Sequence, residues 1–289
     1  MHPLAIVLVL AAAVTHAVWN LYAKRASDGG VVFIWLNAAV STVVYLPVGV
    51  AALILSPPQW TPWVPVALVG SGLIHLGYFS LLQRGYRHGD LTVVYPLARG
   101  TGPALSVLMA MLFFGERPGP IGLLGAAGVV AGILIIGLSQ KGDGSGKVAA
   151  GVLYGIATGL VIATYTIFDA WAVGPLAISP FIFDWVSNAV RVSVLSPYTL
   201  RRRDEIARVW REHRVPVIVV GLLAPMAYIL VLFAYRYADV SLVAPARELS
   251  IVVGSLLGWL LLREQGASRR IAGAVVVLGG VIALALARV

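Results

Sequence analysis

The chain carries one charged, proline-containing segment twice. Residues 86–99 read YRHGDLTVVYPLAR and residues 235–247 read YRYADVSLVAPAR, so that Pro96 corresponds to Pro245 and Arg99 to Arg247. The correspondence continues beyond these segments, where Glu116 matches Glu264. A duplicated apolar segment that is interrupted by proline and carries a charge is typical of membrane carriers whose binding site lies between two repeats.

Composition shows which solvent the fold must face. The sequence is 60% hydrophobic and only 11% charged, with a mean hydropathy of +0.91, whereas soluble domains carry about 25% charged residues. We therefore expect a multi-pass protein of the cell inner or plasma membrane. There are no cysteines, which excludes disulfides and thiolate metal sites. We predict no metal and no cofactor. We also predict no nucleic-acid partner, because the net charge of +9 lies mostly in loops and indicates membrane orientation instead.

Ten apolar segments are long enough to span a bilayer, which requires about 20 residues each. They cover roughly residues 3–22, 31–55, 62–84, 91–114, 119–138, 148–170, 176–198, 215–235, 241–262 and 268–287. Five spans per half force the two halves to run in opposite directions. The sequence thus predicts an all-α membrane protein with two inverted five-helix repeats around a central cavity. The repeats are residues 1–140 and 148–289, and the Gly-rich residues 141–147 form the linker.

Lys and Arg residues indicate the orientation. Most of them lie in the five connections on one side of the predicted bundle, while the other side holds Arg117, Arg236 and Arg288. The positive-inside rule then places both termini outside the cell. The most basic connection, residues 201–214, also has Ile206, Val209 and Trp210 at helical spacing. It is either a segment lying on the anionic inner leaflet or a solvated basic loop.

The pattern resembles a known family. Its first half runs from Pro96 through Phe114-Gly115-Glu116-Arg117 to a Gly-rich segment at 122–137, and its second half has Pro245, Arg263-Glu264 and Gly273 to Gly280. This is similar to the EamA-type repeat of the drug/metabolite transporter superfamily. The resemblance implies a carrier for small metabolites, commonly amino acids and often exported. Members of that family are often drawn with both termini in the cytoplasm, contrary to the charge count, and Arg99 and Arg247 suggest a specialised branch.

Three charged residues lie deep in predicted spans, where a charge costs at least about 2.5 kcal/mol. Arg99 comes roughly 12 Å into its helix, and Arg247 and Glu248 occupy the matching depth in the second half. Adjacent residues differ in direction by about 100°, so we expect Glu248, rather than both, to face Arg99. An arginine could then receive a substrate carboxylate, and Glu248 an ammonium group or a coupling proton. The alternative is a buried ion pair that locks the halves together.

Further polar and aromatic residues are candidates to line the cavity. They are His16, Trp19 and Asn20 in the first span, His75 and Tyr78 in the third, Tyr95 in the fourth, Tyr165 in the sixth, and Tyr228 in the eighth. The sixth span also contains the polar residue Asp169. The histidines are either proton carriers or interhelical hydrogen-bond partners, and the aromatic residues can equally be packing. Pro96 and Pro245 each remove a helical hydrogen bond, which indicates a hinge or a cavity-lining carbonyl, or simply a kink.

The span ends have structural interpretations. Asp90 and Asp239 precede Thr92 and Ser241 and read as helix N-caps. Glu116 and Glu264 read as interfacial ion-pair partners of neighbouring arginines, Arg117 in the case of Glu116. Glycines at small-xxx-small spacing, such as Gly128 and Gly132, predict close helix packing within the chain, and a homodimer seam stays open.

We conclude from the sequence that the chain is a secondary transporter working by alternating access. The expected substrates are small polar or amphipathic metabolites, amino acids first, with export favoured. A carrier of organic anions or other metabolites, and a membrane protein without transport activity, are the alternatives. We do not expect an enzyme, because the chain has no His-Glu-x-x-His and no Gly-x-Ser-x-Gly motif. We expect a monomer.

Overall fold

A computed structural model describes residues 1–88, 91–137, 148–253 and 267–287. The predicted linker 141–147, Asp90, Glu264 and the second half of the ninth predicted span lie outside the described residues. Within the described ranges all regular structure is helical, which confirms the all-α prediction.

The helices follow the predicted spans closely. The first half contains α1 (Pro3–Arg25), the short helix η1 (Ser27–Gly29), α2 (Gly30–Val44), α3 (Leu46–Leu55), α4 (Trp63–His88), α5 (Leu91–Phe113) and α6 (Gly119–Gly137). The second half contains α7 (Val148–Val173), α8 (Pro180–Thr199), α9 (Arg203–Ala234), α10 (Val240–Ala246) and α12 (Ala267–Leu286).

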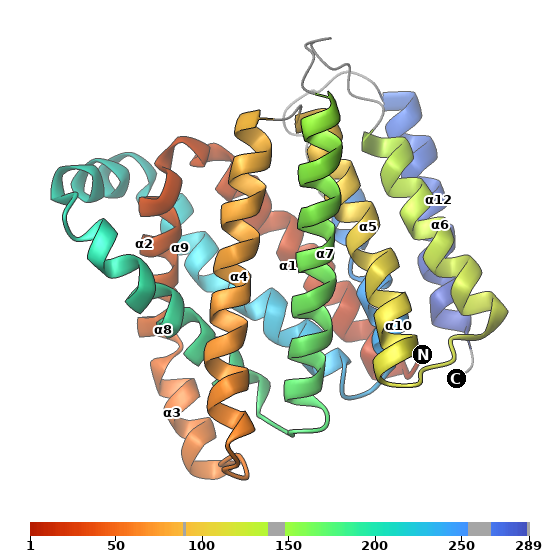
Figure 1. Ribbon diagram of the computed structural model, residues 1–289, viewed down its shortest axis with the longest axis horizontal. Coiled ribbons are helices and arrows are strands. Elements are labelled where there is room, and N and C mark those ends of the chain that lie inside the picture. Colours follow the sequence, from red (N-terminus) through yellow and green to blue (C-terminus); the bar gives the residue numbers. More distant parts are fainter. Residues whose placement is uncertain (89–90, 138–147, 254–266, 288–289) are drawn as a thin grey trace.

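The two halves run in opposite directions. Both chain termini lie at the same end of the bundle, whereas α6 ends and α7 begins at the opposite end (Figure 1). Helix contacts follow the same relation: α1 packs on α9, and their counterparts in the other repeat, α7 and α4, also pack together. Helix α6 packs on α12, which holds the same place in its own repeat. This is the pseudo-two-fold arrangement of an inverted repeat.

Two of the predicted spans are bent by proline. Residues 31–55 form two helices, α2 and α3, which meet at Tyr45 with a bend of 48°. Pro47 has no N–H to donate to the carbonyl four residues earlier. Helix α9 starts at Arg203, well before the predicted residue 215, and has a non-helical residue at His213. Pro216 explains this kink in the same way.

The early start of α9 shows that the basic connection is helical and packs against the bundle. Residues 203–212 are helical rather than a loop, and Val209 is fully buried among residues of α2, including Phe33. Trp210, one residue later, stays 42% exposed. The apolar residues of this segment therefore attach it to the bundle instead of all facing a leaflet.

Glycines set the closest helix approach. A Cβ on Gly280 of α12 would lie 2.7 Å from the carbonyl oxygen of Gly125 in α6, and a Cβ on Gly132 would lie 2.7 Å from that of Gly273. Only residues without a side chain allow backbones to come this near. These glycines pack inside the chain, as predicted.

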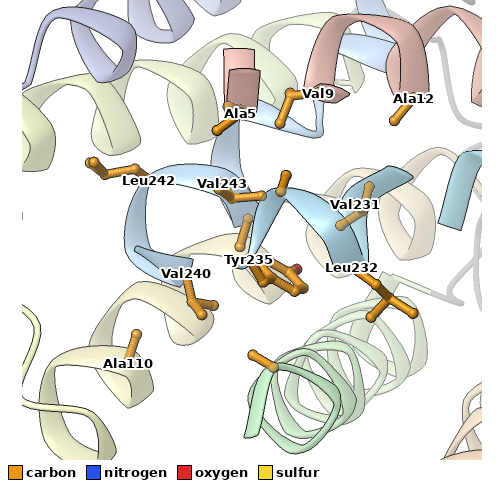
Figure 2. Packing of buried hydrophobic residues seen from close by; sticks show 14 of the residues in the cluster. Ala5, Val9, Ala12, Ala110, Val231, Leu232, Tyr235, Val240, Leu242 and Val243 are labelled. Carbon is orange, nitrogen blue, oxygen red and sulfur yellow. The ribbon is translucent and has the colours of Figure 1, made fainter. Parts of the chain in front are cut away.

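Large apolar side chains cover much of the outer surface, among them Val7, Ile54, Leu112, Leu124 and Leu153. In the described residues four helices are long and apolar enough to cross a membrane, and a fifth span results if α2 and α3 are taken as one bent pair. The interior is also apolar where α1, α5, α9 and α10 meet (Figure 2).

Candidate functional site

The counterpart of α5 is broken at the point where the charged residues lie. Helix α10 ends at Ala246, one residue after Pro245, and the chain passes through a turn at Arg247 and Glu248 before helical structure resumes at Leu249. In the turn, the backbone N–H of Glu248 donates to the carbonyl of Pro245 at 3.0 Å. The turn places Glu248 within reach of Arg99 on α5.

As a result, two guanidinium groups meet one carboxylate. Nε of Arg99 lies 3.3 Å from Oε2 of Glu248, and Nε of Arg247 donates a hydrogen bond of 3.3 Å to Oε1 of the same residue. Glu248 faces Arg99, as expected. Arg247 reaches the same carboxylate from the neighbouring position, a contact that was not predicted from the sequence.

This group of three residues, the Arg–Glu–Arg cluster, is buried but not sealed. The Glu248 side chain is 1% exposed, whereas those of Arg99 and Arg247 keep 11% and 8%. Two positive charges against one negative charge leave one positive charge uncompensated within the cluster. Among the described residues, Nη2 of Arg247 is a buried donor without a hydrogen-bond partner. An anionic group would satisfy both deficits.

Helix α1 contributes the side of the cluster next to Arg99. An amino group of Arg99 lies 3.4 Å from Nε2 of His16, and because a guanidinium only donates, that imidazole nitrogen accepts. The His16 ring packs edge-on against Trp19 at 4.6 Å. Tyr95, one turn before Arg99, has its ring centroid 5.9 Å from the guanidinium carbon. Asn20 is exposed on α1.

Aromatic rings connect the Arg–Glu–Arg cluster to a second polar group. The guanidinium carbon of Arg247 lies 5.9 Å from the ring centroid of Tyr165 in α7. Tyr165 stacks on His75 of α4 at 4.4 Å, and Tyr78 packs against Tyr165 at 5.8 Å. His75 packs edge-on against Tyr228 of α9 at 5.5 Å.

Asp169 stands at the centre of this second group. Its side chain is 0% exposed, its Oδ2 accepts a hydrogen bond from the Tyr228 hydroxyl, and the same oxygen lies 3.8 Å from Nε2 of His75. The sequence placed Asp169 among the polar residues of its span but gave it no role. The signal was available, because an ionisable residue inside an apolar span marks a functional site by default.

A buried polar chain on α8 lies beside this group. The Asn188 amide donates to the Asp184 carboxylate at 2.9 Å, and Arg191 donates to the Asn188 carbonyl oxygen at 2.8 Å. Asp184 and Arg191 are thus joined through Asn188.

The two repeated prolines differ in effect. Helix α5 continues through Pro96, whereas α10 ends just after Pro245. Both prolines are buried. The binding roles and the hinge or cavity role assigned to all these residues from the sequence remain predictions.

The end of the bundle that holds the termini corrects two interpretations. Glu116 accepts hydrogen bonds from the backbone N–H groups of Val240 and Ser241 at 2.9 and 2.8 Å, so it caps α10 rather than serving only as an interfacial ion-pair partner. Asp239 occupies the N-cap position without a side-chain capping bond. Arg236 donates to the carbonyls of Val173 and Ala177, at 3.1 Å each. Burial raises the pKa of Asp239, and the adjacent Glu116 carboxylate adds to this.

A recess opens at this end of the molecule. It has a volume of about 500 Å³ and is lined by residues that include Glu116, Ala170, Tyr235 and Asp239. Tyr235 is 9% exposed, and its buried hydroxyl has no hydrogen-bond partner among the described residues. Asp169 directly precedes Ala170, so the recess comes close to the second polar group.

One cluster outside the spans has the donor atoms that a metal would need. Ligand atoms of Asp28, Glu212 and His213 lie within 4.8 Å of one another. Nε2 of His213 is 3.0 Å from Asp28, and Arg208 is 3.9 Å away. Hydrogen bonding to His213 lowers the pKa of Asp28. Since the His213 ring and Arg208 already contact this carboxylate, we regard the cluster as a cross-link between η1 and the kink of α9.

Comparisons with known proteins agree with this architecture. At 17% identity the chain superposes on a solved crystal structure with a TM-score of 0.75, over 98% of this chain and 96% of that one, which establishes the fold. It is 30% identical over 111 residues to a protein of Pseudomonas aeruginosa named Multidrug transporter PA4990, a match that spans 36% of this chain and 99% of that protein.

A family profile matches both halves separately. The profile described as the EamA-like transporter family covers residues 3–138 and again residues 149–286. The matched regions correspond to the two halves that Figure 1 shows running in opposite directions. The chain is therefore a multi-pass membrane protein that transports small molecules, and it belongs to the EamA-like transporter family.

Proposed function

We propose that the transported molecules are small zwitterionic or amphipathic metabolites, with amino acids as the leading class. The observation that carries this proposal is the Arg–Glu–Arg cluster, in which two guanidinium groups share one buried carboxylate. It offers positive charge for a carboxylate and negative charge for an ammonium group within a few ångströms. A zwitterion satisfies both without adding net charge to the membrane interior.

The chemistry of each group supports specific roles. The planar guanidinium group suits a carboxylate. The Nη2 atom of Arg247, which is buried without a hydrogen-bond partner among the described residues, could donate to a substrate carboxylate. Substrate binding there would weaken the hold of Arg247 on Glu248, which then receives the ammonium group. Tyr165, Tyr78 and the His16–Trp19 pair supply apolar walls for a side chain.

The proposal includes alternating access and export. The turn at Arg247 and Glu248 interrupts a helix beside the cluster, as is usual at carrier binding sites. The distribution of Lys and Arg supports external termini, so that the basic end of the bundle faces the cytoplasm. Tyr95 is exposed on α5 and the Arg99 side chain beside it is partly accessible, so these two residues would take up substrate from that side. We propose a monomer as the transporting unit.

Counterflow in proteoliposomes tests this proposal. Vesicles loaded with unlabelled L-amino acids should accumulate a radiolabelled mixture of the standard amino acids, and Arg99→Ala should reduce the rate at least about tenfold, the equivalent of about 1.4 kcal/mol. Arg211→Ala, a change of an exposed arginine on α9, is the control and should transport normally. Normal counterflow in Arg99→Ala would contradict the role of the cluster.

A carrier for organic anions is the second candidate, because the cluster carries one uncompensated positive charge. Thermal stabilisation of the purified protein separates the two. Amino acids should stabilise it more than the matching carboxylic acids that lack the amino group, and Glu248→Gln should remove that preference. Equal stabilisation by both compounds would favour the anion carrier.

A further inference from the structure

Asp169 lies apart from the Arg–Glu–Arg cluster and has a completely buried side chain. Outside that cluster, it is the one carboxylate in the described part of the spans that combines such burial with an oxygen that lacks a hydrogen-bond partner. Its Oδ2 accepts from Tyr228, and the Ser71 side chain on α4 also interacts with the carboxylate, but Oδ1 is buried without a hydrogen-bond partner among the described residues. A charged oxygen without a partner in an apolar interior is unfavourable.

The orientation of His75 points to the same proton. Its Nδ1 lies 2.9 Å from the carbonyl oxygen of Ser71, and because a carbonyl can only accept, Nδ1 carries a hydrogen. In the neutral ring, Nε2 is then an acceptor, yet it faces the acceptor Oδ2 of Asp169 at 3.8 Å. Two acceptors at this separation repel each other unless one more proton resides on one of them. The pair therefore has a place for one exchangeable proton.

Charged and titratable groups from every neighbouring helix surround this pair. They are Tyr165 on α7 itself, Asp184 and Arg191 on α8, Tyr228 and Tyr235 on α9, and Arg247 after α10. Arg191 and Arg247 act electrostatically on the pair. Arg247 is also a member of the proposed substrate site, so whatever binds there changes the field at Asp169.

The pair lies close to the recess at the termini end. That recess is lined by Ala170, which follows Asp169, and by Tyr235, which interacts electrostatically with Asp169. On its other side the pair is separated from Arg247 by the ring of Tyr165, which stacks on His75. The Asp169 side chain itself is completely buried, so a proton that comes from the recess reaches it only when neighbouring side chains move.

We propose that Asp169 and His75, with Tyr228 as hydrogen-bond donor, form a proton-binding site that couples transport to the proton gradient. The proton moves between bulk water and Asp169 Oδ1 or His75 Nε2 and returns unchanged, so no other reactant is needed. Binding at Arg247 and protonation of the pair influence one another reciprocally, as linkage requires. The coupling to flux depends on the proposed function, whereas the proton site itself does not.

Two measurements test the two parts separately. In proteoliposomes with a pH gradient imposed in either direction, the wild type should accumulate the radiolabelled amino-acid mixture in one direction and not in the other. Asp169→Asn should lose this response but retain counterflow at equal pH on both sides. Asp204→Asn, an exposed carboxylate at the start of α9, is the control and should behave like the wild type. A pH-driven accumulation that survives in Asp169→Asn, or is missing in a wild type with active counterflow, would overturn the coupling.

The second measurement needs no substrate. Infrared difference spectra of the purified protein between acid and alkaline buffer should contain a buried carboxyl band that Asp169→Asn removes and Asp204→Asn leaves. The conservative change His75→Gln, which cannot hold the proton, should shift the midpoint of that band. If the wild type shows no amino-acid counterflow, the substrate assignment fails and this spectrum alone decides the proton site. A spectrum unchanged by Asp169→Asn would overturn the proton site.

Discussion

Nε of Arg99 in one repeat lies 3.3 Å from Oε2 of Glu248 in the other, with Glu248 almost completely buried. This contact joins the two oppositely directed halves of the protein deep within the predicted spans, where a charge is most unfavourable. Because Arg247 approaches the same carboxylate, the pair is not a closed ion pair but part of a group with spare donors. Such a group can both stabilise the halves and exchange one partner for a ligand.

We predict strong and non-additive effects of changing this pair. Glu248→Gln leaves two buried guanidinium groups without their carboxylate and should destabilise the protein by about 3–5 kcal/mol, whereas Arg99→Gln, which leaves Glu248 paired with Arg247, should cost less. The double variant should lose clearly less than the sum of the two. Unfolding of the purified protein, followed by circular dichroism in mixed micelles, measures the three variants. Additive losses would mean that the two side chains do not interact.

Removing the carboxylate that caps α10 should also destabilise the protein. Glu116→Ala deletes two charge-assisted hydrogen bonds to the N–H groups of Val240 and Ser241 and should cost about 1–2 kcal/mol, as for other helix caps. Arg117→Ala is the matched neighbour and should change stability by less than about 0.5 kcal/mol. The same unfolding assay compares them, and a larger loss in Arg117→Ala would restore the ion-pair interpretation.

Neighbouring glycines of α12 should differ sharply when each is changed to alanine. A Cβ at Gly280 would lie 2.7 Å from backbone atoms of α6, which cannot move aside as a side chain can. We expect Gly280→Ala to destabilise the protein by about 1–3 kcal/mol. At Gly279 nothing lies within 4 Å of the added atom, and alanine should be neutral or stabilising, since it favours helix. Equal melting temperatures of the two variants would show that α6 and α12 can move apart without loss of stability.

The pH dependence of one variant follows from the electrostatics at the N-terminus of α10. Burial raises the pKa of Asp239 above its ordinary value, with Glu116 as the second cause. A raised folded-state pKa means that the charged form is disfavoured in the folded protein, so stability is gained as the pH falls through that pKa. Asp239→Asn should therefore raise the melting temperature modestly at pH 7.

The same argument gives the control for that variant. Below the ordinary aspartate pKa of about 3.9 the carboxyl is protonated in both folded and unfolded chains, and the difference between Asp239→Asn and the wild type should disappear. A melting-temperature difference that grows as the solution becomes more acidic would contradict this assignment.

Much of the architecture could be predicted from the sequence because bilayer insertion is a local requirement. Each span must satisfy its own backbone hydrogen bonds and be apolar for about 20 residues, and both properties are visible in a single segment such as Pro3–Arg25. The duplication around Pro96 and Pro245, together with the odd number of predicted spans per half, then gave the inverted arrangement. The approach of Glu248 to Arg99 was likewise predictable, since few partners exist for a charge at that depth.

The contacts that distinguish this protein depended on tertiary structure. Whether Glu116 pairs with its neighbour or caps a helix 124 residues away is decided by which span end lies beside it, and nothing in the local sequence gives that. Glu248 meets Arg99 because α10 packs on α5, and Asp169 meets His75 and Tyr228 because α4, α7 and α9 converge. Side-chain partners are set by the distances between folded helices, whereas hydropathy and repeat symmetry are properties of the chain before it folds.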